Sequence, residues 1–305
     1  MPPQILTQRD LRIKKIAAYS SIAVALSLIG LKTFALIYTE SLAIMSSLID
    51  SSADLLASLV TFWAISFSCR PADISHRFGH GKAEALSALA QAAFIIGSGL
   101  FIIYDAFLRL LYPQPIIKTD IGIIIMIVSL LLSFMLICFQ TYVAKKTNSQ
   151  AIRADALHYL VDVATNLAIL ISLWVVQKWN IVWFDTLTAF VIAIYLLFNT
   201  QKIIKSALAM LMDKELNEDI RDTIIKCAMS ASHVMGIHDL RTRDSGGIYI
   251  IELHLEYDGN LSLNEVHEYT CNVENKIKEI YPSSQVLIHQ DPVGINEERL
   301  DELIS

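Results

Sequence analysis

The chain has 305 residues, of which 54% are hydrophobic and 18% charged, and its mean hydropathy is +0.49. These values exclude an ordinary soluble protein of the same charge content. With a net charge of −6 we expect no nucleic-acid partner. The four cysteines show no metal or redox spacing, and we expect free, packed thiols in a reducing compartment.

Six apolar segments lie in the first two thirds of the chain, each near or above the roughly 20 residues that a membrane-spanning helix needs. They predict an all-α six-helix transmembrane bundle, with helices at about 14–37, 41–68, 83–111, 120–143, 152–177 and 183–204. The first segment is too long for the apolar part of a secretory signal, so we expect it to stay as a helix. Twelve Lys and Arg residues fall on the side that holds the N-terminus, against Arg109, Lys118 and Lys178 opposite, which predicts that both termini are cytoplasmic.

Two pairs of ionisable residues stand four positions apart inside these segments: Asp50 with Asp54, and His158 with Asp162. Residues four apart share one helix face. An Asp at the centre of a membrane helix costs roughly 2.5 to 3.5 kcal/mol, so such residues indicate function. The predicted topology puts all four at a similar depth. Three carboxylates and one imidazole suit a tetrahedral divalent ion, zinc first, and the alternative for each residue alone is a buried packing hydrogen bond.

Other polar residues in the spans receive a simpler interpretation. Lys32 lies near a helix end, where its long side chain can reach the membrane surface. Asp155 precedes His158 by about one turn at the cytoplasmic mouth, and we expect a solvated helix end there.

The loop between the second and third segments carries Asp73, His76 and His80 within eight residues. One carboxylate and two imidazoles are enough for a three-ligand metal site, and the alternative is an ordinary basic loop beside the membrane. The stretch 79–82 reads Gly-His-Gly-Lys, but it lacks the spacing and the following Ser or Thr of a phosphate-binding loop, so we expect no nucleotide.

From residue 213 on, the composition changes to 19 acids against 8 Lys and Arg, whereas residues 1–212 hold 16 bases and 11 acids. We predict a transmembrane domain at 1–212, a separate acidic cytoplasmic domain at 213–297, and a tail at 298–305. The pattern of the second domain is αββαβ, a small α+β fold, with strands near 236–243 and 248–257. Ser262 and Glu265 form a capping-box signature for a helix to about Ile280.

This small domain is rich in histidine. Clustered His and Asp on strand faces can bind one or two zinc ions, and scattered surface histidines are the alternative. In the last strand, His289 and Asp291 are two apart and therefore share one face, away from Val286 and Ile288. The candidates are His238, His254, His267, His289 and Asp291.

These motifs together resemble the bacterial cation diffusion facilitators of the YiiP/FieF zinc and iron efflux type, over nearly the whole chain. The resemblance rests on the two membrane pairs, the loop triplet and the stretches 238–243, 251–256 and 288–292. It implies a homodimer in a bacterial inner membrane that exports a divalent metal in exchange for protons, with a metallochaperone-like cytoplasmic domain.

The resemblance also implies roles for individual residues. The transport site is Asp50, Asp54, His158 and Asp162, and the loop site is Asp73, His76 and His80. A salt bridge between Lys82 and Asp213 would tie the membrane halves together. A binuclear zinc site at the dimer interface would use His238, His254, His267, His289 and Asp291, with Gln290 contributing through its backbone.

Three other functions compete with transport. An intramembrane metalloprotease would need a His-Glu-x-x-His pair or another hydrolytic motif, which the sequence lacks. A passive channel would need rings of charge along a continuous pore. A membrane-tethered metal sensor explains the cytoplasmic histidines but not the polar residues within the spans. Three oxygens and one nitrogen accept zinc, cadmium, ferrous iron or manganese. The resemblance ranks zinc first, with cadmium and ferrous iron behind.

Overall fold

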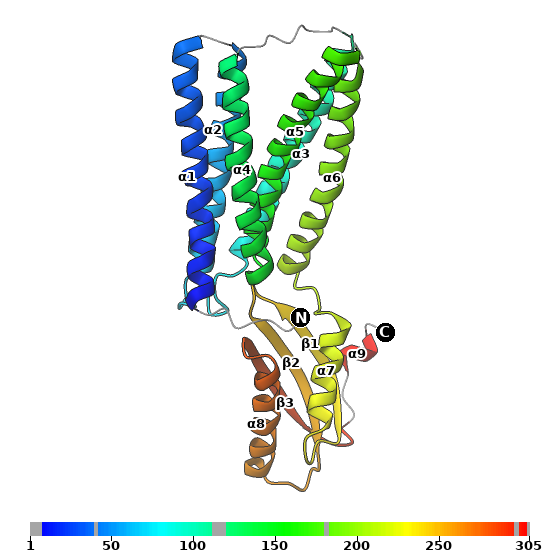
Figure 1. Ribbon diagram of the computed structural model, residues 1–305. Helices are drawn as coiled ribbons and strands as arrows, with labels where there is room; N and C mark the ends of the chain where they lie inside the picture. Colours follow the sequence, from blue (N-terminus) through cyan, green and yellow to red (C-terminus); the bar gives the residue numbers. More distant parts are fainter. Residues whose placement is uncertain (1–7, 40–41, 112–119, 180–182, 296–298, 304–305) are drawn as a thin grey trace. The chain divides into compact units, whose positions relative to one another are not determined.

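The computed structural model describes residues 8–39, 42–111, 120–179, 183–295 and 299–303 (Figure 1). Its contacts divide the chain into two compact units. One unit holds residues 8–71 and 83–208. The other joins the loop 72–82 to the residues from 209 on, so this loop belongs structurally with the C-terminal part of the chain.

Six long helices fill the first two thirds of the described chain, and each overlaps a predicted span. They are α1 (Gln8–Thr39), α2 (Leu42–Ser68), α3 (Ala83–Leu111), α4 (Asp120–Thr147), α5 (Gln150–Trp179) and α6 (Trp183–Leu211). Several run past the predicted apolar limits, because backbone hydrogen bonding continues a helix beyond the residues that must be apolar. The side chains of Arg109, Lys118 and Lys178, used to predict orientation, lie outside the described residues.

Within the described residues, five helices are long and apolar enough to cross a membrane, namely α1, α2, α3, α4 and α6. The predicted fifth span, α5, is 30 residues long but carries Arg153, Asp155 and Asp162, which lower its hydropathy. A helix of this composition can lie in a membrane when its polar face is turned to other helices. Contacts of α5 with α2, α3 and α4 are consistent with that position.

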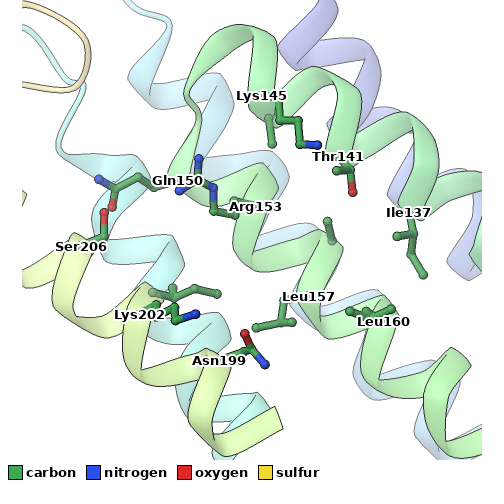
Figure 2. A pocket seen from close by; sticks show the side chains of 13 residues that line it. Ile137, Thr141, Lys145, Gln150, Arg153, Leu157, Leu160, Asn199, Lys202 and Ser206 are labelled. Atoms are coloured by element: carbon green, nitrogen blue, oxygen red, sulfur yellow. The ribbon is translucent and has the colours of Figure 1, made fainter. Parts of the chain in front are cut away.

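Small residues let the helices of the bundle approach closely. Ala17 and Ala18 of α1 pack with Ile65 of α2 and Ala144 of α4, all of them buried. Helix α6 joins α3 and α5 through a second buried cluster, formed by Ile95, Val161 and Leu196. Where α4, α5 and α6 lie side by side, a cavity remains between them (Figure 2).

The second unit has the predicted order αββαβ, followed by a further short helix within the predicted tail. Its elements are α7 (Glu218–Met229), β1 (Gly236–Asp244), β2 (Tyr249–Tyr257), α8 (Leu263–Ile280), β3 (Ser284–Pro292) and α9 (Leu300–Leu303). The strand order is β1-β2-β3, with β1 antiparallel and β3 parallel to β2. A parallel neighbour requires a crossover connection, and α8 supplies it.

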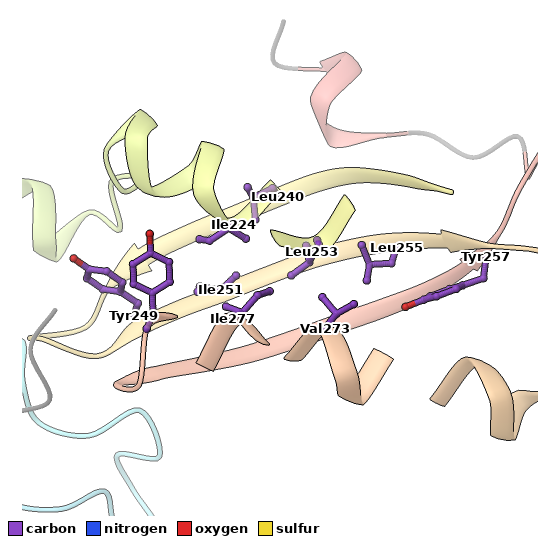
Figure 3. Packing of buried hydrophobic residues seen from close by; sticks show 11 residues of the cluster. Ile224, Leu240, Tyr249, Ile251, Leu253, Leu255, Tyr257, Val273 and Ile277 are labelled. Carbon is purple, nitrogen blue, oxygen red and sulfur yellow. The ribbon is translucent and has the colours of Figure 1, made fainter. Parts of the chain in front are cut away.

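Helices α7 and α8 cover one face of the sheet (Figure 3). The predicted alternation in β2 is confirmed, because Ile251, Leu253, Leu255 and Tyr257 are at most 1% exposed. They pack against Ile224 of α7 and against Val273 and Ile277 of α8. Helices α7 and α8 do not cover the opposite face of the sheet, which carries the histidines. The predicted capping box at Ser262 and Glu265 is also present, which fixes where α8 begins.

Candidate metal centres

Helices α2 and α5 bring together three of the four polar residues predicted as the transport site. Asp54 comes from α2, while His158 and Asp162 stand one turn apart on α5. His158 Nε2 lies 3.1 Å from Asp54 Oδ1, and one ligand atom from each of the three residues lies within 4.8 Å of the others. The side chains of His158 and Asp54 are 7% and 14% exposed. This is a compact N/O donor group inside the helical unit.

Asp50 stands apart from this group. It precedes Asp54 by one turn on α2, which is about 6 Å along the helix axis, and it is exposed. It is not among the residues whose ligand atoms converge in the described part of the chain. The spacing of four residues places Asp50 and Asp54 on the same side of α2, one turn apart.

Asp155 is not the solvated helix end that the sequence suggested. It is 0% exposed, and three helices donate hydrogen bonds to it. Its Oδ2 accepts from Ser21 Oγ of α1 at 2.7 Å and from Gln140 Nε2 of α4 at 2.5 Å. Its Oδ1 accepts from Gln91 Nε2 of α3 at 3.2 Å. The expectation was wrong because hydropathy gives the depth of a residue but does not reveal polar partners on other helices.

Lys32 is likewise engaged within the bundle. Its Nζ donates to Ser51 Oγ of α2 at 2.6 Å, which places its charge beside the residue that follows Asp50. The sequence predicted a side chain reaching the membrane surface. A hydroxyl on a neighbouring helix accepts one hydrogen bond from the ammonium instead.

The loop residues Asp73, His76 and His80 do converge. His76 Nδ1 and His80 Nε2 each lie 3.3 Å from a carboxylate oxygen of Asp73, and one ligand atom from each residue falls within 4.8 Å of the others. The backbone N–H groups of His76 and Ser75 donate to Asp73 at 2.7 and 2.9 Å. These bonds, His76 first, hold the pKa of the Asp73 carboxyl below its ordinary value, so an anionic ligand is preformed.

The predicted pair of Lys82 and Asp213 is close in the structure. Lys82 Nζ donates to Asp213 Oδ1 at 2.7 Å, and Arg243 lies 3.4 Å from the other oxygen of that carboxylate. The Arg243 guanidinium also stands 5.1 Å from the ring centre of Phe78. The loop is thereby joined to β1 and to the segment after α6, all within one compact unit.

In the C-terminal unit, strand register lines up three histidines. His238 of β1 pairs with His254 of β2, which pairs with His289 of β3, and neighbouring rings are 4.9 and 4.6 Å apart. Asp291 joins this row, with its carboxylate oxygens 2.8 Å from His254 Nδ1 and 3.1 Å from His289 Nε2. Ligand atoms of His238, His254 and Asp291 lie within 4.8 Å of one another.

Within the described residues, the side chains of His267 and Gln290 contact other groups. His267 is on α8, where its Nε2 is 3.6 Å from Cys271 Sγ. Gln290 points its amide to Thr270 Oγ1 at 3.0 Å, on the helix side of β3. Glu256, which was not among the predicted site residues, also lies beside this row, with its Oε1 3.5 Å from His238 Nδ1. Its place two residues after His254 on the polar face of β2 was the available signal.

The chemistry of the three groups is similar. Each combines imidazole nitrogen with carboxylate oxygen, which suits zinc and related divalent transition metals. In the C-terminal group, His238 and Asp291 are 6% exposed, whereas the side chains of His254 and His289 are 29% and 64% exposed, so an ion there would be held at the surface by a partly buried ligand set. The residues present therefore fit a metal at this position.

Comparisons with known proteins agree with these features. Residues 18–212 match the cation efflux transmembrane domain, and residues 216–293 match the cytoplasmic domain of cation efflux proteins. The cation-efflux pump FieF of Shewanella oneidensis is 41% identical over 92% of this chain and 95% of its own length. The FieF pump of Yersinia pestis is 42% identical over 92% and 93%.

Among solved structures, the metal-bound C-terminal domain of the CzcD transporter from Thermotoga maritima is 28% identical. It covers 27% of this chain and 100% of its own, with a TM-score of 0.26. The family match and the apolar helices make this a multi-pass membrane protein. The chain belongs to the cation efflux family of membrane transporters, the cation diffusion facilitators.

Proposed function

We propose that this protein exports divalent metal from the cytoplasm by exchanging it for protons, with zinc as the preferred substrate and cadmium and ferrous iron behind it. The observation that carries the proposal is the convergence of Asp54, His158 and Asp162 from two apolar-flanked helices. Placing three ionisable side chains inside a membrane has a high free-energy cost, so such residues are retained when they have a function. Asp50 is proposed as the fourth ligand, one turn away on α2.

Proton exchange follows from the ligand types. A dication binds carboxylates and neutral imidazole, so binding displaces protons and affinity falls as the pH falls. A site that opens alternately to each side would load metal at the cytoplasmic side. Protons from the opposite side would then release it. In this scheme His158 is the proton-exchanging ligand.

The remaining parts have supporting roles. We propose a homodimer in a bacterial inner membrane, with both termini cytoplasmic as the Lys and Arg distribution predicts. Zinc held by His238, His254, His289 and Asp291 would neutralise carboxylates and favour pairing of the two cytoplasmic domains. The loop group and the Lys82–Asp213 pair would link that domain to the transport cycle.

A flux measurement tests the transport proposal. Purified protein in liposomes should take up zinc when a proton gradient is imposed, and His158→Asn should abolish most of the uptake. His233→Asn is the matched control, because His233 lies outside the three groups and its φ of 65° suits Asn. Flux that ignores the gradient, with His158→Asn still active, would refute the coupling. A membrane-tethered sensor would bind zinc in both variants without any flux.

The cytoplasmic site predicts metal-dependent pairing. Replacing His254 and Asp291 together by Ala should make the dimer less stable in zinc, as measured by analytical ultracentrifugation of the full chain with and without zinc. His233→Asn should leave the zinc response intact. A dimer whose stability does not change with zinc concentration in the wild type would contradict this role.

A further inference from the structure

A cavity of about 390 Å³ lies between α4, α5 and α6, and within the described part of the chain no residue of the three metal groups lines it (Figure 2). Helix α4 ends at Thr147 and α5 begins at Gln150, so the two helices meet at one membrane face, and the cavity lies at that end of both. Its lining includes side chains from all three helices, among them Lys145, Arg153 and Lys202.

The charge of this cavity is one-sided. Three cationic side chains line it, and none of the described lining residues is Asp or Glu. Among the described residues, Lys145, Arg153 and Lys202 form no ion pair, whereas the neighbouring Lys146 pairs with Asp10 at 3.2 Å. An uncompensated triplet of cations beside a membrane surface favours an anionic group.

The cavity changes from polar to apolar along the helices. Gln150 and Ser206 lie toward one end of Figure 2, while Ile137 and Leu160 lie toward the other. Ile137 is about 12 Å along α4 from Lys145, and Leu160 is about 10 Å along α5 from Arg153. A headgroup beside the cations would thus continue into a groove lined by aliphatic side chains, which a free inorganic anion would leave unfilled.

This cavity faces away from the metal path. At about 100° per residue, Arg153, Leu157 and Leu160 fall on one side of α5, and His158 and Asp162 fall on the opposite side. Three cations would also repel an arriving dication. The triplet therefore has no evident use in metal transport.

We propose that this cavity binds an anionic phospholipid. Its headgroup phosphate lies among Lys145, Arg153 and Lys202, and an acyl chain follows Ile137, Leu157 and Leu160. A lipid placed there fills the space beside α6 and bridges it to α4 and α5. This inference rests on the membrane location of the helices and does not depend on which metal is exported.

Native mass spectrometry of the full chain in detergent tests the proposal. The protein is titrated with phosphatidylglycerol and with phosphatidylcholine of the same acyl chains. We expect phosphatidylglycerol to bind more tightly, and Arg153→Gln or Lys202→Gln to weaken it about fivefold each, which corresponds to about 1 kcal/mol per cation. Lys205→Gln is the matched control, because it removes one charge from α6 three residues away and outside the cavity. This control should change the affinity for phosphatidylglycerol by less than about twofold.

Four results would overturn the proposal. Equal binding of both lipids would remove the need for an anionic headgroup. An equal loss in Lys205→Gln would indicate diffuse surface charge. Displacement of the lipid by excess inorganic phosphate would indicate a simple anion site. Loss of dimer in Lys202→Gln, without any loss of lipid from the monomer, would assign the cavity to a second copy of the chain. Circular dichroism and elution volume establish that each variant is folded before it is compared.

Discussion

Replacing Asp155 by Asn should destabilise the helix bundle and slow transport, although the two side chains have nearly the same size. The carboxylate accepts hydrogen bonds at both oxygens, from Ser21 and Gln140 at Oδ2 and from Gln91 at Oδ1. An Asn side chain has one acceptor oxygen and one NH₂ donor. Whichever way the amide is turned, at least one donor from a neighbouring helix then faces another donor.

The expected magnitude follows from that mismatch. A buried polar group left without a partner costs about 1–3 kcal/mol, while hydrogen bonds between membrane helices average nearer about 0.6 kcal/mol. We expect a cost of about 1–3 kcal/mol and not the smaller value of about 0.6 kcal/mol, because Asp155 is 0% exposed and the substitution sets one donor against another. At about 2–4 °C per kcal/mol, the melting temperature should fall by roughly 2–12 °C. Since Asp155 precedes His158 by one turn, a shift of α5 would also misplace that ligand.

The assay is thermal unfolding of the full chain in detergent, with zinc flux in liposomes as the second measurement. The double variant Asp155→Asn with Gln140→Glu exchanges the amide and the carboxylate between the two positions and keeps the length of each side chain. It should recover part of the loss in melting temperature and part of the loss in zinc flux. Asp222→Asn, on an exposed position of α7, is the control for a lost charge. An unchanged melting temperature in Asp155→Asn, or a double exchange no better than the sum of its parts, would refute the reasoning.

Two further predictions concern the C-terminal unit. A Cβ at Gly81 would lie 2.5 Å from the carbonyl oxygen of Ser245, so Gly81→Ala should loosen the loop and speed hydrogen exchange over residues 72–82. Ile74→Ala, at a position of the same loop that is 91% exposed, is the control and should raise exchange less. Equal effects of the two substitutions would contradict the steric argument. Bonds from the side chain and then the backbone of Ser262 lower the pKa of Glu265, so its contribution to stability is present above the unfolded pKa and is lost as the pH falls through the folded one. The melting temperatures of wild type and Glu265→Gln should therefore differ at neutral pH and converge in acid, and a gap that persists in acid would count against this linkage.

Local features of this chain could be predicted from the sequence because local geometry determines them. Long apolar runs predicted the membrane helices, the alternation around Leu253 predicted the buried face of β2, and the capping box predicted the start of α8. The spacing of His158 and Asp162 predicted one helix face for the same reason, since it depends only on 3.6 residues per turn. Family membership was also predictable, because the motifs that carry it lie within short stretches.

Which of these faces meet was decided by the tertiary structure. Alternation alone could put His238, His254 and His289 on strand faces, but only the pairing register sets them in one row. Hydropathy could not show that donors from α1, α3 and α4 converge on Asp155. The elements and their polar faces could be predicted because they follow from local periodicity. Which polar groups share a centre depends on helix packing and strand register between residues far apart in the chain, so it is visible only in the folded protein.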